Sequence, residues 1–378
     1  MYPSPCPKKG WRVMNTIKLL NSFYREDVIT DLLCTLINTE ENFAKWFVHT
    51  ICGLSDTEGE FVSKTRIGLG RGIGTPDLVI ERKVDSITNM IIVIENKLGA
   101  LEGEEQTTRY ASEEGIHKLC SSLKIERNIP IKFLFLTLDP YTPAQNPSFD
   151  KRDYLDFVDV NWDGLIRDEA ARKVMSDYAA LLNEFYKPIL SAKLTDDITA
   201  KISSLDALQK KLIWINMLQS VQNDLPNQLK MTFGEAGGFG RNAAVFLFNK
   251  EEWIQNPFDG EKLMANSCNI HFELSINLLS NRNVLDFALH YEPNPYKPKK
   301  EYISVNGYDQ YELLREKRCK YFHQLIKDLN QNKLFTLRNG SNSILKININ
   351  KHQKFKDVVN ELIKIMEKIS PMVDDMMK

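Results

Sequence analysis

Two short segments decide the fold of the N-terminal half, Pro76-Asp77-Leu78-Val79-Ile80 and Ile91-Ile92-Val93-Ile94-Glu95-Asn96-Lys97. Both are rich in β-branched residues, and the polar stretch Asp85–Asn89 lies between them, so they predict a β-hairpin. With the turn centred on residues 86–87, Asp77 faces residues 95–97 of the second strand. Glu95 and Lys97 are two residues apart and therefore point to the same face. The hairpin thus brings two carboxylates and one ammonium together at the end of an apolar strand pair.

This combination of side chains is suited to metal-dependent hydrolysis. Two carboxylates on rigid strands make a hard-oxygen site of the kind that Mg²⁺ or Mn²⁺ prefers. A protonated lysine cannot bind the metal, but it can orient or deprotonate a water and balance charge on a phosphorane. The alternative interpretation is a surface hairpin whose terminal charges form a solvated salt bridge.

The segments around the hairpin predict an α-β-β-β-α-β order of elements. Residues 131–138 are apolar enough for a central strand that is buried on both faces. The expected elements are helices at about Ser22–Ile37, Glu40–Gly53 and Gly103–Leu123, strands at Glu60–Ile67, Asp77–Val84, Met90–Glu95, Ile131–Leu138 and Phe157–Val160, and further helices to about Tyr186.

The second half predicts a separate α+β domain that carries no motif we can assign. We expect a flexible tail over residues 1–15, a first domain over 16–190 and an accessory domain over 198–378, with the boundary near Leu190–Asp197. The expected strands are Ala243–Phe248, Ile270–Leu278, Val284–Tyr291, Leu334–Leu337 and Ile344–Ile349, and the expected helices are Leu205–Gln222, Tyr311–Leu329 and Phe355–Ile369.

The motif residues and the order of elements resemble the PD-(D/E)XK nuclease superfamily. The matching residues are Pro76-Asp77 and Glu95-Asn96-Lys97, and the resemblance covers about residues 22–186. It implies an α/β fold with a restriction-endonuclease-like αβββαβ core. It also implies that Asp77 and Glu95 bind Mg²⁺, for which Mn²⁺ substitutes, with the backbone carbonyl of Asn96 as a third ligand. Lys97 would position the water that attacks a phosphodiester.

The resemblance also points to an acid on the helix before the sheet, where Glu26 and Asp27 stand. Glu26 precedes Ile29, Leu33 and Leu36 by three, seven and ten residues, which places it on the inward face of the helix. We therefore prefer Glu26 to Asp27 as a metal ligand acting through water. The alternative is that both acids only favour the positive end of the helix dipole.

Gln106 and Tyr110 are four residues apart on the helix that follows Lys97 and match the QxxxY of the RecB-like branch. By analogy, Gln106 would orient the lysine or the nucleophilic water, and Tyr110 would contact the phosphate backbone. The alternative is a core aromatic ring beside a surface amide.

Two further stretches are candidates for nucleic-acid contact. The glycine-rich segment 68–74 fails the dinucleotide-binding pattern and precedes a strand, so it predicts either a loop that approaches a nucleic-acid backbone, with Arg71 as a contact, or a simple turn. Lys297, Lys299 and Lys300 alternate with aromatic residues and could track phosphates and stack bases. The alternative for them is an ordinary charged loop.

Composition excludes several classes of protein. The chain has 378 residues, of which 43% are hydrophobic and 26% charged, as in soluble globular proteins. Its 49 basic and 50 acidic side chains give no global positive field, so a nucleic-acid site must be a local patch. The six cysteines form no CxxC pair, which excludes a zinc ribbon and a disulfide framework. The six histidines show no triad or metal spacing, and we interpret each as structural or exposed.

No signal peptide and no apolar run of the ~20 residues of a membrane helix is present, so we expect a cytoplasmic protein without a membrane partner. The resemblance implies a nuclease, with DNA as the expected partner, in bacterial restriction, repair or phage defence. One alternative is a non-catalytic nucleic-acid-binding or scaffold protein on the same fold. Another is a gated effector that stays inactive until its C-terminal domain binds a partner or ligand. A homodimer, the choice between DNA and RNA, and end against internal cleavage are left open.

Overall fold

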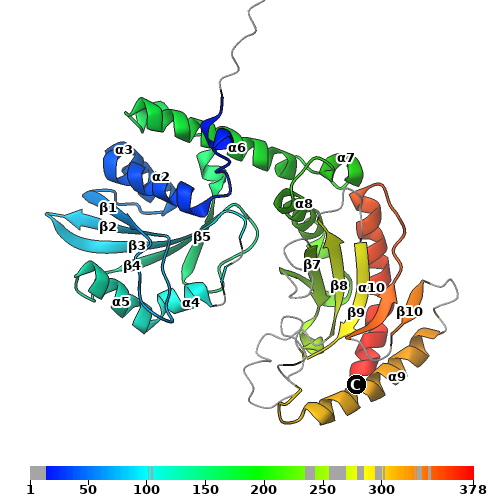
Figure 1. Cartoon of the computed structure of the whole chain (residues 1–378). Helices are drawn as coiled ribbons and strands as arrows, with labels where there is room; N and C mark the ends of the chain where they lie inside the picture. The colour runs from blue at the N-terminus through cyan, green and yellow to red at the C-terminus, as the bar shows by residue number, and fades with distance from the viewer. Residues whose placement is uncertain are drawn as a thin grey trace, which may run out of the picture. The chain divides into compact units, whose positions relative to one another are not determined.

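The computed structural model describes residues 14–100, 102–103, 105–234, 243–254, 270–278, 285–293, 300, 303–327, 329, 334–338 and 342–378. The chain divides into two compact units, and the division falls between Lys187 and Pro188 (Figure 1). Among the described residues, no helix is both long enough and apolar enough to cross a membrane.

The described residues of the first unit form a mixed five-stranded sheet with strand order β1-β2-β3-β4-β5. Strands β1 (Glu60–Thr65), β2 (Leu78–Val84) and β3 (Ile87–Lys97) are antiparallel, whereas β4 (Ile131–Thr137) and β5 (Phe149–Asp153) run parallel to β3. The central strand β3 is therefore flanked by an antiparallel and a parallel neighbour.

Helices cover both faces of this sheet. Figure 1 shows α2 and α3 on one side and α4 and α5 on the other. On the α4 and α5 side, Val79, Ile91 and Val93 form an apolar core with Tyr110 and Leu119. The helices of this unit are α1 (Thr16–Leu19), α2 (Glu26–Thr39), α3 (Glu41–Trp46) with a π turn at Phe47–Ile51, α4 (Gln106–Ala111), α5 (Glu113–Leu123), 3-10 turns at Tyr154–Phe157 and Trp162–Gly164, and α6 (Glu169–Leu190), whose last residues belong to the second unit.

The β2–β3 hairpin has the register that the sequence predicts, with Leu78 opposite Ile94. Its connection is shorter than expected, because β3 already begins at Ile87. Asp85 and Ser86 form the turn with φ values of 52° and 65°. Two consecutive residues with positive φ are typical of the type I′ turn, whose twist matches that of the strands it joins.

The prediction of a strand at Phe157–Val160 is wrong. The fifth strand is β5, and residues 154–157 form a 3-10 turn instead. Strand β5 pairs only with β4, and of its residues only Phe149 is buried. An edge strand of this kind lacks the apolar pattern that identifies strands in a sequence. The apolar residues Tyr154 and Phe157 are buried, but they belong to the 3-10 turn that follows β5.

The single helix predicted over Gly103–Leu123 is two helices, which meet at Ser112. The backbone of Ser112 is extended, and its side chain accepts a hydrogen bond from Gly115 N as the N-cap of α5. A Cβ atom at Gly115 would lie 2.3 Å from the carbonyl oxygen of Arg109, so glycine permits the close approach of α4 and α5. The break sets the direction of α4, which carries Gln106 and Tyr110.

The described residues of the second unit form an antiparallel sheet with strand order β10-β11-β9-β8-β7-β6. Phe272 of β8 stacks on Phe287 of β9, and Trp253 packs on Phe272 while donating a hydrogen bond to Asp374 of α10. The apolar face of the sheet is therefore the face towards α10. The strands are β6 (Lys230–Gly234), which the sequence did not predict, β7 (Ala243–Asn249), β8 (Ile270–Asn277), β9 (Leu285–Tyr291), β10 (Phe335–Leu337) and β11 (Ser343–Ile347), and the helices are α7 (Ile198–Ile202), α8 (Ala207–Gln219), α9 (Tyr308–Lys327), α10 (Phe355–Met377) and 3-10 turns at Gln222–Asp224, Pro226–Gln228 and Glu251–Trp253.

The hairpin turn gives the first testable prediction. Ser86 is exposed and has a φ of 65°, which is unfavourable for any side chain with a Cβ atom. We expect Ser86→Gly to raise the free energy of unfolding by about 0.5–1 kcal/mol, as measured by denaturant titration. Ser121→Gly is the matched control, because Ser121 is exposed inside α5 and glycine there should destabilise. Destabilisation by both substitutions would contradict the turn geometry.

Candidate active site

Asp77 and Asn96 meet where the hairpin opens. Asp77 immediately precedes β2, and its Oδ2 accepts a hydrogen bond of 2.8 Å from the backbone N–H of Asn96. Since the N–H and C=O groups of one strand residue point to the same edge of the strand, the carbonyl of Asn96 also points to the Asp77 side. The carbonyl of Lys97 points the other way and accepts from Leu138 N at 3.0 Å. The resemblance implies that the Asn96 carbonyl is a metal ligand, and this arrangement leaves the carbonyl on the Asp77 side of β3.

Glu95 lies on the same face of the sheet as Asp77 and is completely buried, with 0% of its surface exposed. Its Oε1 accepts hydrogen bonds from Lys97 Nζ at 2.5 Å and from Gln106 Nε2 at 2.6 Å. Its Oε2 is buried and accepts no hydrogen bond from an N–H or hydroxyl donor of the described residues, while the carboxyl groups of Glu95 and Asp77 are within hydrogen-bonding reach of each other. One oxygen of Glu95 is therefore held by the protein, while the other is left beside the carboxylate of Asp77.

Crowding of the two acids changes their protonation. Burial and the neighbouring charge of Asp77 raise the pKa of Glu95 to about 8, against the opposing effect of Lys97. Burial also raises the pKa of Asp77, although the Asn96 N–H and the Lys97 charge oppose this. Burial lowers the pKa of Lys97, but the charges of Glu95, Glu26 and Asp77 outweigh burial and the net pKa is raised. Lys97 therefore keeps its proton at neutral pH.

Glu26 reaches the same cluster from the first turn of α2. Its Oε1 accepts a hydrogen bond of 2.9 Å from Leu98 N, and its Oε2 lies 3.8 Å from Lys97 Nζ. Asp27 is instead exposed and paired with Arg25, whose hydrogen bond lowers the pKa of Asp27. The structure thus brings Glu26, and not Asp27, to the motif residues.

A buried polar contact fixes the strand from the opposite face. The side chain of Asn96 donates to Thr30 Oγ1 at 3.0 Å and accepts from the Tyr154 hydroxyl at 2.9 Å. All three residues are buried, and Thr30 belongs to α2. Since unpaired polar groups are costly in a core, this network holds β3 against α2 in one arrangement.

Gln106 and Tyr110 lie on the Glu95 side of the sheet. Gln106 Nε2 contacts both Glu95 and the Tyr110 hydroxyl, the latter at 3.0 Å. The hydroxyl also accepts from Thr75 N at 3.3 Å, and the tyrosine is only 2% exposed. The prediction that Tyr110 contacts a phosphate backbone is therefore not supported, because its ring is in the core and its hydroxyl is occupied by Gln106 and Thr75.

The glycine-rich segment is a loop that packs on Tyr110. Gly74 has a φ of 112°, and a Cβ atom there would lie 3.2 Å from the Tyr110 ring. Arg109 Nε donates to the carbonyl of Ile73 at 3.2 Å and fastens the loop to α4. Arg71 is exposed in the turn of this loop, which leaves it accessible to a ligand.

Of the three basic residues proposed from the second half, only Lys300 is among the described residues. Lys297 and Lys299 lie outside the described residues, and Lys300 is exposed in the second unit.

The acids fit a divalent cation by their donor chemistry. Asp77, the buried Oε2 of Glu95 and the Asn96 carbonyl offer oxygen ligands, which Mg²⁺ and Mn²⁺ prefer. Two buried carboxyl groups this close cannot both stay ionised without a cation, which is why the pKa of Glu95 is raised. The arrangement also leaves Lys97 and Gln106 on the opposite oxygen of Glu95, where they do not compete for the cation.

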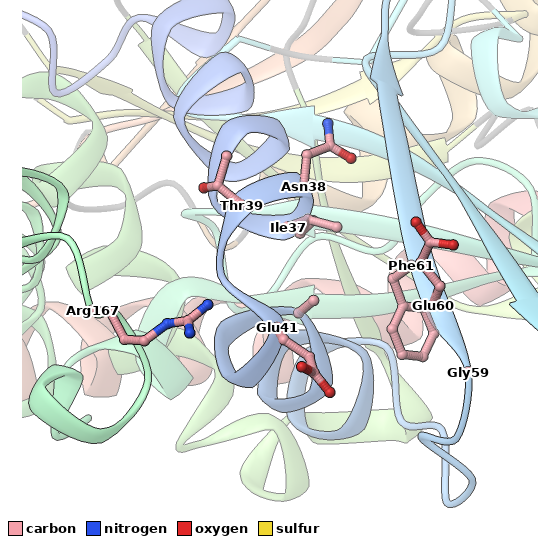
Figure 2. Close-up of a pocket in the computed structure, with 9 residues that line it drawn as sticks. Ile37, Asn38, Thr39, Glu41, Gly59, Glu60, Phe61 and Arg167 are labelled. Carbon is pink, nitrogen blue, oxygen red and sulfur yellow. The ribbon is translucent and has the colours of Figure 1, made fainter.

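A pocket lies at the other end of α2 and includes none of these residues (Figure 2). Figure 2 shows Arg167 facing the corner between α2 and α3, with Glu60 and Phe61 on β1. Arg167 anchors this corner, because its backbone N–H and its Nε both contact the buried carboxylate of Glu40. The pocket is lined by Ile37, Asn38, Thr39, Glu41, Ala44, Gly59, Glu60, Phe61 and Arg167.

Comparisons of the chain with protein-family models, with curated proteins and with solved structures find no match. The functional interpretation therefore depends on the geometry of the chain itself.

The sequence interpretation missed one polar cluster in the second unit. His271, Glu273, His290 and Glu292 lie together on β8 and β9, although each histidine was interpreted as structural or exposed. A signal was present, because the pattern His-x-Glu occurs at 271–273 and again at 290–292 on consecutive predicted strands.

The raised pKa of Glu95 predicts a specific pH dependence of stability in the absence of divalent cations. A carboxyl whose pKa is about 8 in the folded state binds a proton more tightly when folded than when unfolded, so its stabilising effect is lost as the pH rises towards 8. We expect the wild type to lose roughly 1 kcal/mol per pH unit relative to Glu95→Gln between about pH 5 and 8, measured by denaturant titration in EDTA.

The matched control is Glu81→Gln, which changes a buried carboxylate of β2 that pairs with Lys64 and Thr88. Parallel pH profiles of the wild type and Glu95→Gln would show that Glu95 is ionised in the folded chain and would contradict the argument.

Proposed function

We propose that the first unit is a metal-dependent nuclease that hydrolyses phosphodiester bonds. The observation that carries the proposal is the contact of Asp77 with the buried Glu95 beside Lys97, in which Glu95 Oε2 accepts no hydrogen bond from an N–H or hydroxyl donor of the described residues. The order of α2, the three antiparallel strands, α4 with α5, and β4 supports a restriction-endonuclease-like core. In this proposal the catalytic site lies at the open end of the β2–β3 hairpin, where β2 begins and β3 ends.

Asp77, Glu95 and the Asn96 carbonyl would hold Mg²⁺, with Mn²⁺ as a substitute and Glu26 contributing through water. A bound Mg²⁺ would stabilise the negative charge that develops on the scissile phosphate. Glu26 has one oxygen committed to Leu98 N, so its remaining oxygen is the one that faces the cluster.

Lys97 would act on the attacking water and the phosphate, whereas Gln106 would act through Glu95. Because its pKa is raised, Lys97 acts as a charged hydrogen-bond donor and not as a base at neutral pH. Gln106 fixes Glu95 Oε1 from α4, so it is a positioning residue for the acid. Arg71 on the exposed loop turn is a candidate contact for the nucleic-acid backbone.

The substrate that we propose is DNA, and we propose a role in bacterial restriction, repair or phage defence in the cytoplasm, as the resemblance implies. The accessory unit would bind substrate, sense a ligand or mediate oligomerisation.

Cleavage of labelled linear, circular and single-stranded DNA, and of RNA, with Mg²⁺, Mn²⁺ or EDTA tests the proposal. We expect Asp77→Asn and Lys97→Met to lower the cleavage rate by roughly 10²-fold or more, because the first removes a charged metal ligand and the second removes the positive charge beside the reacting phosphate. Relative rates on circles and linear duplexes separate internal from end cleavage.

The Lys64–Glu81 pair, whose Nζ and Oε1 are 3.0 Å apart, supplies the matched control on the same sheet. Lys64→Met should retain cleavage, since it removes a similar ion pair away from Asp77. Wild type that binds nucleic acid but cuts none of these substrates would support the non-catalytic or gated interpretation instead. Equal loss of cleavage in the Lys64 and Lys97 variants would argue for a general effect on folding.

A further inference from the structure

A second group of potential metal ligands lies in the C-terminal unit, on the sheet face opposite the apolar core. His271 and His290 are directly opposed in the β8–β9 register. Glu273 and Glu292 each follow a histidine by two residues, so strand alternation puts all four side chains on one face. One donor atom from each residue lies within 4.8 Å of the others.

The separations between these atoms are close to those around a bound cation. His271 Nε2 lies 3.8 Å from Glu273 Oε2 and 3.7 Å from Glu292 Oε1. His290 Nδ1 lies 3.8 Å from Glu273 Oε2 and 3.1 Å from Glu292 Oε1. Tetrahedral zinc bonds of about 2.0–2.1 Å place neighbouring ligand atoms about 3.4 Å apart, so small side-chain shifts would complete such a site.

Each glutamate is oriented by a hydrogen bond to the carboxylate oxygen that does not face the histidines. Ser275 Oγ donates to Glu273 Oε1 at 3.0 Å, and Asn342 Nδ2 donates to Glu292 Oε2. The second oxygen of each glutamate faces the histidines, where Glu292 Oε1 is within hydrogen-bonding distance of His290 Nδ1, and a cation between them would replace this contact. Support of this kind from outside the ligand set is typical of metal sites in proteins.

Burial makes a cation favourable here. His271 is 0% exposed, and Glu273 and Glu292 are 8% and 6% exposed. With neutral imidazoles the group carries two negative charges, and burying carboxylates is costly unless they are paired with cations or bind metals. A divalent cation would neutralise the group, and two imidazoles with two carboxylates suit zinc and the neighbouring transition metals better than Mg²⁺.

We propose that His271, Glu273, His290 and Glu292 bind one Zn²⁺-class cation and tie β8 to β9. Four protein ligands close the coordination sphere, so the site is structural and carries no reaction of its own. The proposal does not depend on nuclease activity in the first unit.

Titration of the chelator-stripped full chain with Co²⁺, followed by visible absorption, tests this site. We use the Asp77→Asn, Glu95→Gln background to remove the acids of the first unit. We expect one equivalent of Co²⁺ with the strong absorption of four-coordinate cobalt, displaced by Zn²⁺, and a rise in the thermal midpoint on adding Zn²⁺. His271→Gln should weaken Co²⁺ binding at least tenfold.

His352→Gln is the matched control, because His352 pairs with Glu361 at 2.6 Å in the same unit but outside the group. It should leave Co²⁺ binding unchanged. If His271→Gln fails to fold by circular dichroism, His290→Gln at a partly exposed position carries the same test.

Two results would overturn the proposal. Absence of Co²⁺ and Zn²⁺ binding by the folded chain would show that the four residues form only an ion-pair network with protonated histidines. Co²⁺ binding that survives both histidine substitutions would place the cation elsewhere.

Discussion

The first unit is organised around the burial of Glu95 opposite Asp77. The register that pairs Leu78 with Ile94 places the two acids on one face, and a slip of one residue would put them on opposite faces. The pairing of β2 with β3 therefore also fixes the acids. The same constraint explains why a costly contact between carboxylates persists in the folded chain.

Hydrogen bonds from neighbouring residues stabilise only one of the two oxygens of Glu95. Lys97 and Gln106 donate to Glu95 Oε1, while Glu26 holds the end of β3 through Leu98 N. Asp77 receives the Asn96 N–H, but Glu95 Oε2 receives no hydrogen bond from an N–H or hydroxyl donor of the described residues. The hydrogen-bond donors of the site thus hold β3 and Glu95 Oε1 in place. The oxygens that remain, on Asp77 and at Glu95 Oε2, are those that a cation would stabilise.

The hairpin and the inward position of Glu26 could be predicted because both depend on local periodicity, of two residues in a strand and 3.6 in a helix. Strand β5 could not, because it forms at an edge from mostly polar residues. The break at Ser112 depends on a cap and on the close approach that Gly115 allows. The buried state of Tyr110 depends on the loop at Gly74, which no pattern in α4 reveals.

The histidine cluster could not be predicted from the sequence for a different reason. Its two His-x-Glu patterns are visible in the sequence, but their meeting depends on the β8–β9 register, which the two patterns do not fix by themselves. Both clusters use the same device, since side chains two residues apart on adjacent antiparallel strands share a face. The two clusters differ in the atoms that they offer to a cation and in whether those atoms complete its coordination. The acids before β2 and at the end of β3 offer oxygens from a strand end, where further ligands can join. The histidines and glutamates surround one point with four donors, which favours a cation that holds strands together over one that takes part in a reaction.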